Sequence, residues 1–66
     1  MPRKYRKAEA QLRRLGFVVR RGKGSHRSWR HPDGTVVIVL SGNPGDDVRD
    51  YHEEQITKAI AEIEDE

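Results

Sequence analysis

The 66-residue chain contains no cysteine, so disulfide bonds cannot stabilise it and cysteine-based zinc fingers and ribbons are not expected. Long apolar segments are also missing, since the longest run, Val36–Leu40, is too short to cross a bilayer. The basic N-terminus is not followed by an apolar stretch of the kind found in signal peptides. We therefore expect a cytoplasmic protein that does not associate with membranes.

Apolar residues make up only 33% of the chain, which limits the core to a small one. We expect a single domain over residues 1–66. Charge is unevenly distributed: residues 1–31 contain 11 Lys and Arg and one acid, Glu9, whereas residues 32–66 contain two Lys and Arg and ten acids. This separation predicts a basic face for a polyanion, unless the two halves neutralise each other in the fold.

Two helices are predicted from apolar residues spaced three and four positions apart. The first helix covers residues 4–15 and ends before Gly16, where a left-handed residue is typical. The second covers residues 51–63, with Asp50 as its N-cap and Glu53 completing a capping box. The apolar stripes consist of Tyr5, Ala8, Leu12 and Leu15 in the first helix, and of Ile56, Ala59, Ile60 and Ile63 in the second.

Between the helices, β-branched and aromatic residues predict strands over residues 17–21, 25–30 and 35–40, separated by turns that contain glycine. These strands follow one another closely enough to form an antiparallel meander. Both helical stripes must be buried, and the meander is the only predicted sheet they can pack against. The sequence therefore predicts an α+β fold of order α-β-β-β-α, with a three-stranded antiparallel sheet and two helices on one face.

Alternation of side chains along a strand predicts which residues lie on the face without helices, called here the open face. Trp29 is expected to face the helices, which places His26 and Arg30 on the open face with Arg20 and, nearby, Lys23. The open face would then present a histidine surrounded by cations.

The third predicted strand cannot alternate, because Val36–Leu40 is apolar throughout. Either Val36, Ile38 and Leu40 or Val37 and Val39 must point to the open face. An apolar strip on an edge strand needs a cover. A protein partner and the loop of residues 41–49 are the two alternatives.

Several motifs in the first two thirds of the chain are similar to those of HicA (YcfA-like) toxins, which are small bacterial and archaeal mRNA interferases. The resemblance covers residues 8–40, and Gly24-Ser25-His26 is its most specific part. The longer loop before the second helix departs from the shorter members of the family. The matching motifs are Leu15-Gly16-Phe17, Arg21-Gly22-Lys23-Gly24-Ser25-His26 and Arg30-His31-Pro32-Asp33-Gly34.

The resemblance implies a fold like that of the double-stranded RNA-binding domain and a toxin of a type II toxin–antitoxin system. It implies an endoribonuclease that cleaves mRNA with His26 as the catalytic residue. It also implies a HicB-like antitoxin, expected to cover the open face and the third strand, and a homodimer is left open. The predicted RNA-binding residues are Arg20, Arg21, Lys23, Gly24, Ser25, Arg27 and Arg30.

One histidine can start RNA cleavage because RNA carries its own nucleophile, the 2′-hydroxyl. A neutral imidazole accepts that proton, and the oxygen attacks the neighbouring phosphorus to form a 2′,3′-cyclic phosphate. We expect the cations Lys23, Arg27 and Arg30 to disfavour a charged His26 and to bind the phosphate. His31 should lie on the opposite face, too far away to act as the acid.

No cofactor and no metal site is expected, because the three histidines lie on separate segments and no cysteine accompanies them. A non-catalytic RNA-binding module of the same fold is the alternative function. A DNA-binding protein is less favoured, since neither helix has the character of a base-reading helix.

Overall fold

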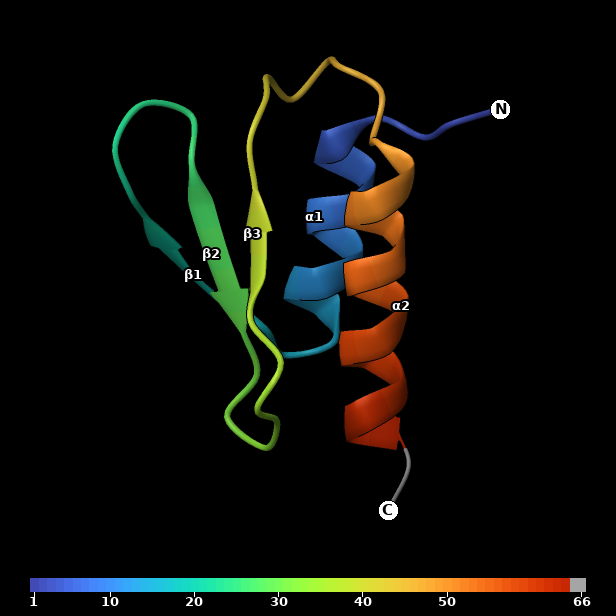
Figure 1. The fold of residues 1–66 in the computed structure, drawn as a ribbon. Coiled ribbons are helices and arrows are strands. Elements are labelled where there is room, and N and C mark those ends of the chain that lie inside the picture. The colour runs from blue at the N-terminus through green and yellow to red at the C-terminus, as the bar shows by residue number, and fades with distance from the viewer. Residues whose placement is uncertain (65–66) are drawn as a thin grey trace.

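The computed structural model describes residues 1–64, so the last two residues of the predicted domain lie outside the described residues. Its elements are helix α1 (Tyr5–Arg14), strands β1 (Val18–Arg21), β2 (Arg27–Arg30) and β3 (Ile38–Leu40), and helix α2 (Asp50–Glu64). Both helices lie on one face of the sheet (Figure 1). The predicted α+β fold of order α-β-β-β-α is confirmed. Neither helix is long and apolar enough to cross a membrane.

The sheet is an antiparallel meander with the strand order β1-β2-β3. Trp29 of β2 pairs with Ile38 of β3, and both side chains are buried. Ser28, one position earlier, pairs with Arg20 on β1 and Val39 on β3, which are both exposed. The two faces therefore alternate as predicted, with the row of Trp29 toward the helices and the row of Ser28 on the open face.

The core fills the space between the sheet and the two helices, and both predicted helical stripes contribute to it. The prediction was wrong for Leu15, which is 37% exposed at the C-cap of α1. Val48 also enters the core, from a loop for which no core residue was predicted. Ile60 and Ile63 pack against the core and are partly buried. The buried apolar residues are Tyr5, Ala8, Leu12, Phe17, Trp29, Ile38, Leu40, Val48, Ile56 and Ala59.

Strand β3 is shorter than predicted, because the segment before it is bound to α2 instead of β2. The backbone N–H groups of Thr35 and Val36 donate to Oε1 of Glu62, at 2.7 and 3.0 Å. The ladder with β2 therefore begins only at Ile38. A contact with a residue so distant in the sequence leaves no local signal in the strand itself.

The predicted capping box at the start of α2 is wrong. Asp50 is the first helical residue, and the carbonyl of Arg49 already accepts the N–H of Glu53 at 3.0 Å. The Glu53 carboxylate instead pairs with Arg3, at 2.8 Å. The predicted end of α1 is confirmed, because Gly16 has φ 96°.

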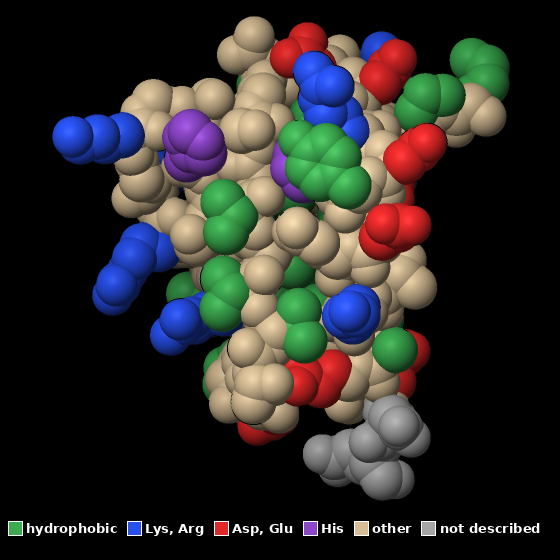
Figure 2. Space-filling model, in the orientation of Figure 1, with side chains coloured by type: hydrophobic (Ala, Val, Ile, Leu, Met, Phe, Trp, Pro, Cys, Tyr) green, Lys and Arg blue, Asp and Glu red, His purple; other side chains and the backbone are tan. Residues whose placement is uncertain are grey.

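The open face carries the apolar strip that was predicted from the sequence of the third strand. Val37 and Val39 are 39% and 45% exposed, whereas Ile38 and Leu40 are buried. Val18, 58% exposed, lies on the same face at the other edge strand. We call Val18, Val37 and Val39 the valine strip. Apolar side chains are visible at the surface on this side of the molecule (Figure 2).

Candidate active site

His26 lies at the end of the turn between β1 and β2, one position before β2 begins. Its backbone N–H donates to the Lys23 carbonyl at 3.2 Å, which closes a tight turn. Gly24, the second residue of that turn, has φ 62°, a conformation that favours glycine. The N–H of Gly22 donates to the His26 carbonyl at 2.9 Å and continues the hairpin. The glycines therefore hold His26 at a defined place on the hairpin.

The ring of His26 is oriented by a second contact with the same turn. Its Nδ1 lies 3.1 Å from the carbonyl oxygen of Lys23. A carbonyl oxygen can only accept, so Nδ1 carries the hydrogen, and the neutral ring has its lone pair on Nε2. The side chain is exposed. Nε2 is therefore available to accept a proton from a molecule bound at the surface.

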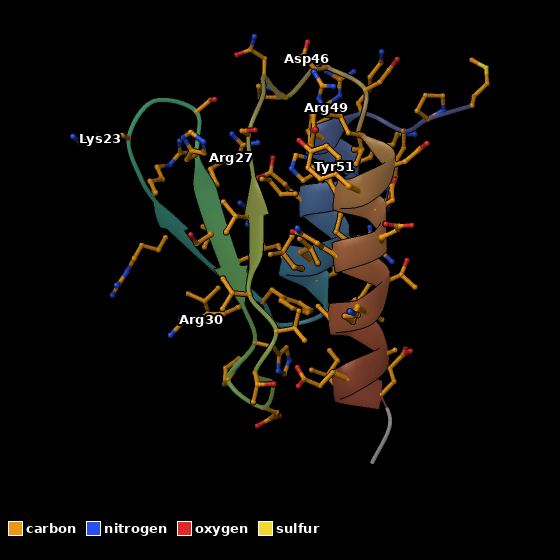
Figure 3. The ribbon with its side chains drawn as sticks, in the orientation of Figure 1. Lys23, Arg27, Arg30, Asp46, Arg49 and Tyr51 are labelled. Atoms are coloured by element: carbon orange, nitrogen blue, oxygen red, sulfur yellow. The ribbon has the colours of Figure 1, made fainter. Side chains whose placement is uncertain are left out.

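The surface next to His26 is open and basic. A Cβ at Gly22, opposite His26 on the hairpin, would lie 3.6 Å from the His26 Cβ, so the glycine leaves that space free. Arg20 and Arg30 are exposed on the open face, and within residues 1–64 neither forms an ion pair. Lys23 and Arg30 point away from the helices (Figure 3).

Arg27 is not a free cation beside His26, because its guanidinium group is paired within the protein. Its Nε donates to Oε1 of Glu9 at 2.6 Å, and its Nη1 donates to the carbonyls of Gly42, at 3.0 Å, and of Ser25. The side chain is only 11% exposed. Its charge is therefore paired on the helix-facing side, where alternation from Trp29 places it, and the expectation that it acts as one of the cations beside His26 is wrong. Its role in RNA binding stays a prediction.

His31 contributes to the fold, on the side away from His26. Its Nε2–H donates to the carbonyl of Leu15 at 3.0 Å, and its Nδ1 accepts the N–H of Asp33 at 3.1 Å. The ring packs edge-on against Phe17, with ring centres 5.1 Å apart. The predicted separation of His26 and His31 is confirmed, and the two rings cannot share a substrate atom.

His52 is buried at the start of α2, and its Nδ1 lies 2.7 Å from the hydroxyl of Tyr5. That hydroxyl accepts the N–H of Arg49 at 3.4 Å, so its own hydrogen is directed to Nδ1. Burial, and then the charges of Arg49 and Arg27, lower the pKa of His52 below 6.5. His52 is thus a neutral acceptor that links α2 to α1.

The predicted RNA-binding residues divide between the two sides of the hairpin. Arg20 and Arg30 lie on the open face, alternation from Arg27 puts His26 on the same side, and Lys23 lies in the turn. A cleft on the helix-facing side is lined by the others, which are Arg21, Gly24, Ser25 and Arg27. Sequence reasoning missed Arg6 and Arg13, which line the same cleft from α1. Their positions off the apolar stripe of α1 were the available signal.

The chain matches the model of a known protein family. The family model described as "HicA toxin of bacterial toxin-antitoxin" matches residues 5–62. The matched range includes α1, all three strands, the turn with His26 and most of α2. No curated protein matches the chain.

Within residues 1–64, no three His, Asp or Glu side chains are grouped as a metal site requires.

Proposed function

This chain belongs to the HicA toxin family, and from that premise we propose that it is an mRNA interferase that cleaves messenger RNA with His26 as the general base. Membership of the family makes it a toxin of a toxin–antitoxin system, with a cognate antitoxin as its partner. One observation carries the proposal: the bond from His26 Nδ1 to the Lys23 carbonyl leaves Nε2 free on an exposed basic surface.

The proposed reaction begins when Nε2 of His26 accepts the proton of a ribose 2′-hydroxyl. The oxygen attacks the adjacent phosphorus, the bond to the 5′ oxygen of the next nucleotide breaks, and a 2′,3′-cyclic phosphate remains. Arg20, Arg30 and Lys23 supply positive charge for the phosphate as negative charge develops on it. The nucleophile belongs to the RNA and the base is a side chain, so this mechanism assigns no step to a metal ion or cofactor.

The leaving 5′ oxygen needs a proton, and the other two histidines are not placed to give one. His31 is bonded to backbone groups on the far side of β2, and His52 is buried against Tyr5. The proton returns from protonated His26 or comes from water. Because general acid–base steps contribute only about 10²–10⁴-fold to a rate, a site with one histidine should be a slow nuclease.

We propose that the antitoxin is a HicB-like protein that covers the open face and β3. The valine strip shares this face with Arg20 and Arg30, which form no ion pair among the described residues 1–64. A partner with an apolar centre and acidic margins would bury the valines and neutralise the arginines. The same contact would block access to His26, so binding of the antitoxin and inhibition of cleavage would be one event.

The test uses a short oligoribonucleotide in the presence of EDTA, and the same oligonucleotide with 2′-deoxyribose at the cleaved position. We expect the wild-type protein to cut only the first, with a 2′,3′-cyclic phosphate at the new end. His26→Gln should bind this RNA normally and cut it at least about 10²-fold more slowly. Equal rates for His26→Gln and the wild type would refute the proposal. RNA that is bound but never cut by the wild type would indicate a non-catalytic RNA-binding module.

A further inference from the structure

A second basic surface lies on the helix-facing side of the hairpin. It is a cleft of about 570 Å³ between α1, the β1–β2 hairpin and the loop segment 42–44. Val19 and Trp29 contribute apolar atoms to its lining, and Gly24 and Ser25 border it from the turn. Its charged lining consists of Arg6, Arg13, Arg21, Arg27 and Glu9.

The cleft has more positive charge than the protein itself neutralises. Its one carboxylate, Glu9, accepts hydrogen bonds from Arg27 and, at 3.0 Å, from the indole N–H of Trp29. The other three arginines form no ion pair within residues 1–64. Nη2 of Arg27 is buried and has no hydrogen-bond partner among the described residues. A concave surface with this excess of positive charge attracts an anion.

The chemistry of the lining favours a phosphate. Guanidinium groups offer parallel N–H donors that match the oxygens of a phosphate, and they stay charged at any physiological pH. The guanidinium carbon of Arg13 lies 5.4 Å from the centre of the Trp29 ring. This cation–π contact holds the guanidinium group over the cleft lining. The apolar atoms of Val19 and Trp29 suit a neighbouring sugar or base better than they suit a free inorganic ion.

The turn between β1 and β2 connects this cleft to His26. Gly24 and Ser25 line the cleft, and the next residue along the chain is His26 itself. A single RNA strand with its scissile phosphate at Nε2 of His26 would reach the cleft by passing around this turn. Lys23 projects from this turn, away from the helices (Figure 3).

We infer that the cleft binds a backbone phosphate of the RNA that flanks the cleaved one, with Arg6 and Arg13 as its principal contacts. This inference rests on the proposed RNA substrate. It adds a subsite on the opposite side of the sheet from the catalytic histidine. RNA would therefore be bound on both sides of the hairpin.

The test measures binding, so that it does not depend on cleavage. In a His26→Gln background, Arg6→Gln and Arg13→Gln are compared with Arg14→Gln, an exposed arginine of α1 that does not line the cleft. Affinity for a short fluorescein-labelled single-stranded RNA is measured by anisotropy at several salt concentrations. We expect each cleft variant to lose roughly threefold or more in affinity and about 0.7 from the salt slope, and Arg14→Gln to lose much less.

A second measurement locates the phosphate. Neutral methylphosphonates replace the phosphates of the RNA one at a time. One flanking replacement should weaken binding to the parent protein but have no further effect on the Arg6→Gln variant. Arg6 is chosen for this measurement because the arginine stacked on Trp29 is Arg13. Circular dichroism confirms that the variants are folded.

Two outcomes would overturn the inference. In the first, all three arginine variants bind RNA with the same affinity. In the second, the cleft variants bind RNA normally and lose affinity only for the antitoxin, which would mean that the cleft binds a carboxylate of that protein. Failure of the proposed nuclease activity would be seen separately, as uncut RNA with the wild-type protein. Loss of affinity in the cleft variants would still be measurable in that case.

Discussion

Glu9 of α1 and Arg27 of β2 form an ion pair with an N–O distance of 2.6 Å, and both side chains are only 11% exposed. Glu9 is the one acid among residues 1–31. It also accepts the indole N–H of Trp29, so a single carboxylate satisfies two donors from β2. The pair joins the first helix to the strand that follows His26.

We expect Glu9→Gln to lower the free energy of unfolding by about 3 kcal/mol, because it leaves the Arg27 charge buried without a counterion. A loss of that size is a large part of the stability of a small domain. Urea unfolding followed by circular dichroism measures it. The matched control is Asp47→Asn, which breaks the exposed pair with Lys4 and should cost at most about 1 kcal/mol. Equal costs for the two variants would contradict this account.

The second prediction concerns His52 and pH. Its pKa in the folded protein is lowered below 6.5, so between that lowered value and 6.5 the unfolded chain binds more protons than the folded one. The stability that His52 contributes is therefore complete above pH 6.5 and is lost as the pH falls through the folded pKa. Urea unfolding from neutral pH to about pH 5 should show this loss.

His52→Gln is the control for this pH dependence. Glutamine can still bond the Tyr5 hydroxyl, but it does not titrate. We expect the free energy of unfolding of His52→Gln to fall less over the same pH range than that of the wild-type protein. An NMR titration of the His52 ring gives an independent check, and a midpoint at or above 6.5 would contradict the prediction.

The faces of the sheet could be predicted from the sequence because one large residue determines them. Trp29 is too apolar to be left in water, and once it faces the helices, alternation places Ser28 and Arg30 on the other side. The helices were predicted for a similar reason, since their stripes repeat at the period of the helix. Local periodicity thus carried the fold and the exposed position of His26.

Contacts between distant residues could not be predicted in this way. Arg27 pairs with Glu9, 18 positions away, and nothing in the strand distinguishes an arginine that will be paired from one that stays free. Glu62 binds the segment before β3 from 26 or 27 positions away. The bond that orients the His26 ring was also missed, because it depends on the shape of the turn rather than on residue type.

The third prediction concerns Gly16, which ends α1 with φ 96°. An added Cβ would lie 3.1 Å from Nε2 of His31, the atom that donates to the Leu15 carbonyl. We expect Gly16→Ala to cost about 1–2 kcal/mol from the backbone conformation alone. Gly45→Ala is the control, because its Cβ would meet nothing within 4 Å and should change stability by at most about 0.5 kcal/mol. Thermal unfolding of the two variants measures the difference, and similar melting temperatures would count against it.

The last prediction tests whether the valine strip is where the antitoxin binds. Val39→Thr keeps the shape and β-branching of the side chain but replaces one methyl group with a hydroxyl group. If Val39 is buried by the antitoxin, the substitution should weaken the complex about tenfold, since burial of a valine contributes about 1.5 kcal/mol or more. Stability of the free protein should hardly change, because Val39 is 45% exposed there. Isothermal titration with the cognate antitoxin gives the affinity.

Leu15→Thr serves as the matched control, because Leu15 is also a partly exposed apolar residue but lies at the end of α1, outside the valine strip. It should leave the affinity for the antitoxin unchanged. If Leu15→Thr weakens the complex and Val39→Thr does not, the antitoxin binds the helical side of the molecule. His26 would then stay accessible in the complex, and the antitoxin would have to inhibit the toxin by some means other than covering His26.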